Sequence, residues 1–311
     1  MAGIYYGSMY GGSTTAVLVN IPGEAASVVT CLDGHEMAKR GRAGPALGIA
    51  ALGSFVAGTF AIVALMLVAP ILAKVAVAFG PPEYFSLMVL GLTILSFLTQ
   101  GSMIKALLMA AVGVVIGLIG LDQINAMPRL TFDRLELVDG IGLVPVVMGL
   151  FGVSEILSNI EQQIRRDIVQ SRIGSLWPSR EDLKASAGPI GRGTLLGFLL
   201  GVLPGCGAVI SSFASYAIEK KLSRTPERFG KGAIEGVAGP EAANNAAAGG
   251  AFIPLMTLGI PPNVIMALLL GAFVIHGLQP GPLMMSQNPK IFWGIIASMY
   301  VGNVMLLVLN M

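Results

Sequence analysis

The chain of 311 residues is 54 % hydrophobic and only 12 % charged, and its mean hydropathy is +0.78. Soluble domains carry about 25 % charged residues, so an ordinary soluble fold and a disordered chain are excluded. The formal net charge of +2 provides no field that would attract nucleic acid. The 41 glycines and 18 prolines are typical of membrane helices that break or pack closely.

Apolar runs follow one another along the chain. A membrane helix needs about 20 mostly apolar residues. Runs of this kind are predicted at 46–72, 84–99, 103–121 and 291–309, with shorter ones at 141–156, 193–203 and 264–275. The expected fold class is therefore all-α: a polytopic membrane protein with broken or re-entrant helices and an inverted repeat.

The basic residues indicate the orientation. They concentrate in segments 33–44, 161–192 and 219–231, whereas the loop 122–140 carries several carboxylates. Because basic loops stay in the cytoplasm, all three segments are predicted on that side and the loop 122–140 outside. The stretch 193–216 must then leave and return to one face, as a re-entrant hairpin with its tip at 203–207. A single kinked span that places Lys220 outside remains the alternative.

Three glycine-rich polar islands interrupt the apolar pattern, at 10–24, 201–215 and 236–263. Each combines a proline that can end or start a helix with glycines and with hydroxyl, amide or carboxylate side chains. Secondary transporters hold substrates and coupling ions with broken helices that meet near the membrane midplane. The candidate substrate- and ion-binding residues are Gly12, Ser13, Thr14, Thr15, Asn20, Pro22, Gly23, Glu24, Pro204, Gly205, Gly207, Pro240, Glu241, Asn244, Asn245, Gly259 and Pro261.

Glu24 and Glu241 are the strongest of these candidates. A charge inside the membrane costs at least about 2.5 kcal/mol, so such a residue is a functional hypothesis by default. The alternative, in which both carboxylates lie in water at the interface, stays open. We expect Glu241, Asn244 and Asn245 to hold a cation or a proton, although the two asparagines could instead cap or cross-link helices.

The islands also predict contacts with an anion. The hydroxyls of Ser13, Thr14 and Thr15, and the N–H groups that follow Pro22 and Pro204, are expected to face substrate carboxylates, because helix N-termini favour anions. The charged residues of another polar stretch, Asp33, His35 and Glu36, are interpreted as solvated. No metal site or disulfide framework is predicted from two cysteines and two histidines.

A faint repeat links the first and third islands. Gly11-Gly12 is followed by Asn20-Ile21-Pro22, and Gly249-Gly250 by Gly259-Ile260-Pro261, with one residue of slip. The expected organisation is a first repeat region with its following spans at 1–160, a basic cytoplasmic linker at 161–192 and a second repeat region at 193–311. The partner upstream of the first copy and the spans after the second are expected to be missing.

Six stretches carry a resemblance to a known family: 10–15, 20–24, 32–44, 201–208, 235–245 and 259–261. They resemble the large membrane subunit of the tripartite tricarboxylate transporters, the TctA-like family, and the run Pro-Glu-Ala-Ala-Asn-Asn is specific. The resemblance implies a multi-pass carrier of the bacterial inner membrane that imports tri- or dicarboxylates with Na⁺ or H⁺. It also implies two partners, a small membrane subunit and a periplasmic solute-binding protein.

Other functions remain as alternatives. Glu241-Ala242-Ala243 is similar to the loop by which permeases of ATP-driven importers dock on their ATPase, but Ala247 stands where a glycine is expected. A passive channel would be expected to have charged rings along one pore. An enzyme is not expected, because Cys206 and Ser211 have no suitably placed histidine. No cofactor is expected beyond the coupling cation.

Overall fold

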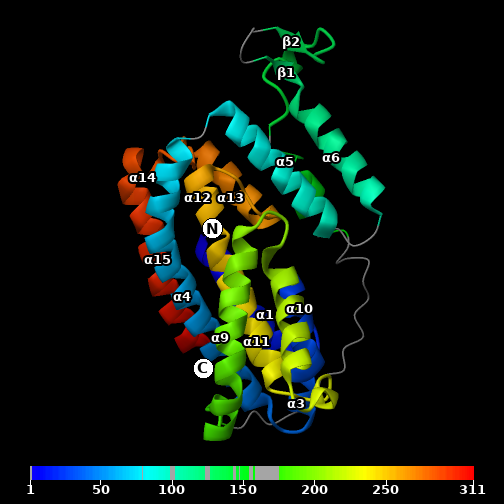
Figure 1. Ribbon diagram of the computed structural model, residues 1–311, viewed down its shortest axis with the longest axis vertical. Coiled ribbons are helices and arrows are strands. Elements are labelled where there is room, and N and C mark those ends of the chain that lie inside the picture. The colour runs from blue at the N-terminus through cyan, green and yellow to red at the C-terminus, as the bar shows by residue number, and fades with distance from the viewer. Residues whose placement is uncertain are drawn as a thin grey trace.

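The computed structural model describes residues 2–78, 80–98, 102–122, 127–142, 145–146, 148–153, 157 and 175–311. These residues are helical apart from loops and one two-stranded ribbon, which confirms the all-α class (Figure 1). The α-helices are α1 (Ala2–Val19), α2 (Val28–Thr30), α3 (Glu36–Lys39), α4 (Ala43–Val77), α5 (Pro81–Leu98), α6 (Met103–Gly117), α9 (Arg180–Val202), α10 (Gly207–Leu222), α11 (Glu235–Gly250), α12 (Phe252–Leu258), α13 (Val264–Ile275), α14 (Met284–Gln287) and α15 (Pro289–Asn310).

Shorter elements connect these helices. Strands β1 (Gly120–Leu121) and β2 (Pro128–Arg129) pair antiparallel. Single turns of 3₁₀-helix lie at Ala25–Ser27, Leu135–Leu137 and Pro226–Arg228, and π-helical turns lie at Cys31–His35 and Met148–Val153. The 3₁₀ and π turns around α2 place a compact polar segment against α1 and α11.

Among the described residues, two helices are long and apolar enough to cross a membrane, α4 and α15. Large apolar side chains on α4, including Val56, Phe60, Val63 and Leu67, are exposed at helical spacing. Extended exposed apolar surface of this kind is what a membrane or a partner protein covers. The predicted runs at 84–99 and 103–121 are helical as α5 and the shorter α6, whereas much of the run at 141–156 lies outside the described residues.

Helix α11 is the centre of the structure and is buried along almost its whole length. It packs against α9, α4 and α10 (Figure 1). A Cβ atom added at Gly193, Gly197 or Gly201 would lie only 2.1–2.3 Å from a carbonyl oxygen of α11. The two backbones therefore touch at three points over roughly two turns, because α9 presents a glycine at every fourth position between Gly193 and Gly201.

The chain reverses direction between α9 and α10. The two helices pack side by side, and Arg192 near the middle of α9 pairs with Glu219 near the end of α10 at 2.8 Å and 2.5 Å. The alternative of a single kinked span is therefore wrong. The linker boundary predicted at 192 falls inside α9, because Ser179 caps a helix that starts at Arg180 and runs through Pro189.

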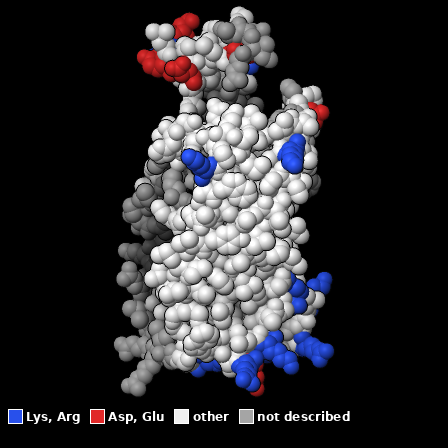
Figure 2. All heavy atoms as spheres, turned by 90° about the vertical axis from the view of Figure 1, so that its left-hand side faces the viewer, with Lys and Arg blue, Asp and Glu red and all other residues white. Residues whose placement is uncertain are grey.

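Charge divides the molecule along its long axis. In Figure 2, basic side chains gather at the end where Figure 1 places α3 and the start of α9, while acidic ones gather at the opposite end near β1 and β2. The face between them is almost free of charge apart from isolated basic side chains. This distribution matches the polarity that the positive-inside rule predicts from the sequence.

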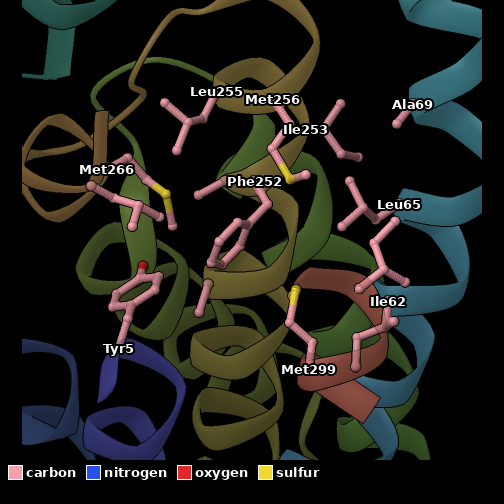
Figure 3. Close-up of a cluster of buried hydrophobic side chains, with 14 of the residues drawn as sticks. Tyr5, Ile62, Leu65, Ala69, Phe252, Ile253, Leu255, Met256, Met266 and Met299 are labelled. Carbon is pink, nitrogen blue, oxygen red and sulfur yellow. The ribbon is translucent and has the colours of Figure 1, made fainter. Parts of the chain in front are cut away.

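An apolar cluster fills the region around α12. Tyr5, Ile62, Phe252, Met266 and Met299 come from five different helices and meet there (Figure 3). Each is at most 5 % exposed. The cluster holds α12 firmly at the point where the chain leaves it, and so it positions the irregular segment 259–263.

Candidate functional site

The helix interruptions are shorter than the predicted islands. Residues 12–15 lie inside α1, and residues 240–245 lie inside α11. The chain leaves helical structure instead at 20–24, 203–206 and 259–263. The first and third islands therefore do contain helix interruptions, but their stretches 12–15 and 240–245 remain helical. Close packing keeps glycine helical there despite its low helix propensity.

Two of the interruptions share one backbone design. Asn20 and Gly259 both adopt left-handed conformations, with φ of 55° and 71°. The next residue in each, Ile21 or Ile260, donates its N–H to the carbonyl six residues earlier, at 3.3 Å and 3.2 Å. Each bond spans one residue more than the 6→1 bond of a Schellman motif, and it likewise closes the end of a helix at a left-handed residue. A proline follows in both copies and prevents the helix from resuming.

Both interruptions also end in the same way. Glu24 and Asn263 are extended residues that cap the helical turn after them. Glu24 accepts the N–H of Ala26 at 2.5 Å, and Asn263 accepts the N–H of Met266 at 3.0 Å. The segments 20–24 and 259–263 therefore share their left-handed first residue, the wide bond of the second, the proline at the third and the capping residue at the fifth. This likeness is consistent with the faint repeat in the sequence.

A buried cluster of polar side chains lies below the first interruption. Glu241 on α11 is 1 % exposed; its carboxylate accepts a hydrogen bond from Ser13 on α1 at 2.6 Å and another from Thr30 on α2. Asn244, one turn further along α11, donates to Glu24 at 3.0 Å. Asn244 makes this bond through its NH₂ group, and its side-chain oxygen is buried without a hydrogen-bond partner. We call these five residues the carboxylate cluster.

The carboxylate cluster has no compensating positive charge among the described residues. Neither Glu24 nor Glu241 forms an ion pair there, and the two carboxylates lie within electrostatic range of each other. No group of three or more His, Cys, Asp and Glu that could hold a metal occurs in the described part of the chain. The cluster offers hard oxygen atoms and negative charge, which suit a monovalent cation or a proton.

A second group of predicted residues surrounds the turn between α9 and α10. The N–H of Gly205 donates to the carbonyl of Pro262 at 2.8 Å, which joins the second and third islands. Pro204, Gly205 and Pro261 line a mainly apolar cavity of about 730 Å³. Gly197 packs on Ala243 and Gly201 on Ala247, so α9 and α11 run in the same direction. The turn after α9 therefore lies about seven residues beyond Asn244 along α11, which is roughly 10 Å at 1.5 Å per residue.

The predicted anion donors are only partly available. The helical turn after Pro22 is already capped, because Ala26 binds Glu24. Helix α10, after Pro204, has no side-chain cap at Cys206. Its first N–H groups are therefore the ones that an anion could use.

The hydroxyl row of α1 does not face an anion as predicted. Ser13 donates its hydrogen to Glu241, and Thr15 donates to the carbonyl of Gly12 at 3.2 Å. Thr14 lines a small cavity towards α4. Carboxylate and carbonyl acceptors nearby take the hydrogens of the first and third hydroxyls, so these two cannot bind a substrate carboxylate in this conformation.

The remaining predicted residues have mostly structural contacts. Asn245 donates to Ser54 at 2.7 Å and to the carbonyl of Glu241 at 3.1 Å. The carbonyl of Pro240 accepts from Ser212 at 3.2 Å. Gly12 and Gly23 touch, since a Cβ atom on Gly23 would lie 2.5 Å from the Cα atom of Gly12. Asn20 and Pro22 are exposed, Gly207 lies beside Asn263, and Gly259 lies against Pro280.

Several residues were missed or misread at the sequence level. Thr30 and Ser54 belong to the polar contacts around Glu241 and Asn245 but stand in apolar sequence. Asp33 is 0 % exposed; it accepts hydrogen bonds from Tyr216 at 2.9 Å and from the N–H groups of Gly232 and Ala233. The interpretation of Asp33 as solvated was wrong, because the π-helical turn directs it inward.

The two neighbours of Asp33 differ from each other. His35 is also buried, with Nδ1 3.0 Å from the carbonyl of Val17, so its interpretation as solvated was wrong too. Glu36 lies at the surface, where a hydrogen bond from Lys39 lowers its pKa. The apolar residues that flank Asp33 in the sequence were the available signal for its burial.

Comparison with known proteins finds one family and two relatives that are similar to this chain. The whole chain, residues 1–311, matches the family described as "Tripartite tricarboxylate transporter TctA family". An uncharacterised 52.8 kDa protein of the TAR-I ttuC' 3' region in Agrobacterium vitis is 54 % identical over 311 residues, which is 100 % of this chain and 62 % of that protein. An uncharacterised protein of the TAR-II ttuC' 3' region in the same organism is 62 % identical over 115 residues, 37 % of this chain and 48 % of the relative.

The chain thus spans less than two thirds of the length of either relative. No solved structure matches it. The family match nevertheless covers every residue of the chain, including all three islands. The chain therefore belongs to the tripartite tricarboxylate transporter TctA family, a family of membrane-transporter components.

Proposed function

We propose that this chain is part of the large membrane subunit of a secondary importer that moves tri- or dicarboxylates together with Na⁺ or H⁺. It acts in the bacterial inner membrane as a multi-pass protein, with a small membrane subunit and a periplasmic solute-binding protein as partners. The observation that carries the proposal is the carboxylate cluster, in which Glu241 is buried and Glu24 is partly buried, and neither has a basic partner among the described residues.

The coupling ion binds at the carboxylate cluster. Two carboxylates close together in a low-dielectric interior repel each other, and a bound cation or proton relieves that repulsion. The free oxygen of Asn244 adds an uncharged ligand that is already desolvated. An unpartnered buried oxygen costs about 1–3 kcal/mol, which a bound ion recovers. The fold therefore favours the ion-bound state.

The substrate binds at the uncapped start of α10, next to the turn that lies roughly 10 Å along α11 from the carboxylate cluster. The N–H groups at the start of α10 carry the positive end of the helix dipole. Asn263 lies directly beside Gly207 at this point and adds an amide. Since no Lys or Arg lies within the islands, the bound cation supplies the remaining positive charge. Binding of anion and cation is coupled for this reason.

Alternating access uses the repeated interruptions. The matching segments 20–24 and 259–263 support an inverted repeat between the regions 1–160 and 193–311. The α9–α10 hairpin is re-entrant, with both of its ends on the cytoplasmic side. Movement of this hairpin relative to α1 and α2 would expose the substrate to each side in turn. An ATP-driven permease and a passive channel are not favoured by any contact in the described residues.

Replacement of one carboxylate tests the proposal. Proteoliposomes that contain the complete transporter would be assayed for uptake of radiolabelled citrate and other carboxylates under Na⁺ or pH gradients. Glu241→Gln keeps the size of the side chain and removes its charge, so ion-stimulated uptake should fall at least tenfold. Glu36→Gln, at an exposed acid paired with Lys39, is the matched control and should transport normally.

Two results would contradict the proposal. Uptake that requires ATP and ignores both ion gradients would show a different energy source. Unchanged uptake with unchanged ion dependence in Glu241→Gln would remove the carboxylate cluster from coupling.

A further inference from the structure

A small cavity lies beside Ser13, between α1 and α4. It has a volume of about 10 Å³, and its polar lining comes from Tyr10, Ser13 and Thr14 of α1, Ser54 of α4 and Asn310 of α15. A cavity of roughly this size holds one water-sized particle and nothing larger. Its occupant must therefore be a single water or a single small ion.

Two of the hydroxyl groups that line this cavity donate their hydrogens to acceptors outside its lining. Tyr10 donates its hydrogen to Asn303, and Ser13 donates its hydrogen to Glu241. Both oxygens therefore offer only lone pairs to the cavity. Two oxygens that present lone pairs to a space of this size favour a cation.

Ser54 is held in place from outside the cavity. Asn245, which does not line the cavity, directs its NH₂ group to Ser54 and to the carbonyl of Glu241. Because Asn245 is 1 % exposed, this bond fixes the hydroxyl group of Ser54 beside the cavity.

We propose that this cavity is a second cation-binding site and that it takes one Na⁺ ion. The inference rests on the proposed function in its Na⁺-coupled form, and it adds a second ion to the one at the carboxylate cluster. The polar lining consists of uncharged groups, namely four hydroxyl groups and the side-chain amide of Asn310, and a divalent ion would demand carboxylate ligands of its own. Ser13 links the two sites, since its oxygen faces one ion while its hydrogen binds the carboxylate that holds the other.

Binding of ²²Na⁺ to the purified complete transporter tests this site directly. The wild type should bind two ions for each copy of this subunit. Thr14→Val, which keeps the shape of the side chain, and Ser54→Ala should each reduce this number to one. The Hill coefficient for Na⁺ in citrate uptake should fall from about 2 to about 1. Thr257→Val is the matched control, because its buried hydroxyl bonds only to Ile253 within α12.

The outcomes separate this inference from the proposed function. One bound ion in the wild type, with both variants unchanged and uptake still driven by the gradient, would mean that the cavity holds only water. That result overturns the second site and leaves the first. Loss of the second ion in either folded variant, with Thr257→Val unaffected, supports the site. A wild type that binds no ²²Na⁺ overturns both the second site and Na⁺ coupling.

Discussion

At the scale of single residues, buried polar groups fall into two kinds. Asp33 uses its carboxylate fully, with a tyrosine hydroxyl and two backbone N–H groups as donors. Asn244 and Asn245 each keep one buried oxygen without a partner. A fully satisfied group stabilises a fold, whereas an unsatisfied one costs free energy that a bound water or ion can recover. The first kind predicts a loss of stability on mutation, and the second a loss of ion binding.

Asp33→Asn tests the first kind. The amide can keep its oxygen on the N–H groups of Gly232 and Ala233, but its NH₂ group then faces the hydroxyl of Tyr216, which donates to Asp33 in the wild type. We expect the free energy of unfolding to fall by about 1–3 kcal/mol, because hydrogen bonds to a charged carboxylate are replaced by weaker neutral ones. Thermal unfolding of the purified transporter in detergent, followed by tryptophan fluorescence, measures this loss.

The same variant should bind Na⁺ normally wherever it is folded. Asp33 contacts none of the five residues of the carboxylate cluster through a hydrogen bond in the described structure. An Asp33→Asn protein with wild-type stability but impaired ²²Na⁺ binding would contradict the structural role given to this carboxylate.

At the scale of elements, the hairpin could be predicted and the long glycine-containing helices could not. The turn after α9 depends on a local signal, Leu203-Pro204-Gly205, because proline ends the helix and glycine reverses the chain. Helix α11 depends instead on distant contacts, since its backbone touches the glycines of α9. A sequence read locally shows only the weak helix propensity of glycine, and the packing that overrides it is invisible there.

Gly197→Ala is the prediction at this scale. The added Cβ atom would lie 2.1 Å from the carbonyl oxygen of Ala243, so α9 and α11 would have to separate. Overpacking of this kind costs typically about 1–3 kcal/mol. We expect a lower unfolding temperature and, because α11 carries Glu241, weaker ion-stimulated uptake.

Gly191→Ala is the control on the same helix. No atom lies within 4 Å of the Cβ position at Gly191. Alanine stabilises a helix by roughly 0.5–1 kcal/mol relative to glycine, so this variant should be at least as stable as the wild type. Equal destabilisation by both substitutions would show that the glycines of α9 serve something other than close approach to α11.

At the scale of the whole molecule, the polarity was predictable and the assembly of the site was not. The orientation follows from counting basic residues along the chain, which requires no contacts. The carboxylate cluster joins Glu24 to Asn244 and Ser13 to Glu241, residues more than 200 positions apart. Both acids could be selected from the sequence because a carboxylate among apolar residues is costly. Their proximity depends on how α1 packs against α11, for which the sequence holds no local signal.

The orientation itself gives the last prediction. Helix α4 has 35 residues, which corresponds to roughly 50 Å, and the hydrocarbon core of a bilayer is about 30 Å thick. We therefore expect the acidic end with β1 and β2 and the basic end with α3 to lie on opposite sides of the membrane. In a variant without native cysteines, Asp133→Cys should react with a membrane-impermeant maleimide in cells whose inner membrane is intact. Lys221→Cys should react only after the inner membrane is permeabilised.

Both substitutions lie at exposed loop or helix-end residues and should leave the protein folded. The labelling therefore reports on which side of the membrane each end lies. Labelling with the two positions exchanged would reverse the orientation while preserving the two ends. Labelling of both positions from the same side would be incompatible with a chain that crosses the bilayer through α4. The basic residues around α3 and the end of α10 would then have to be explained by a partner surface rather than by the cytoplasmic face of the membrane.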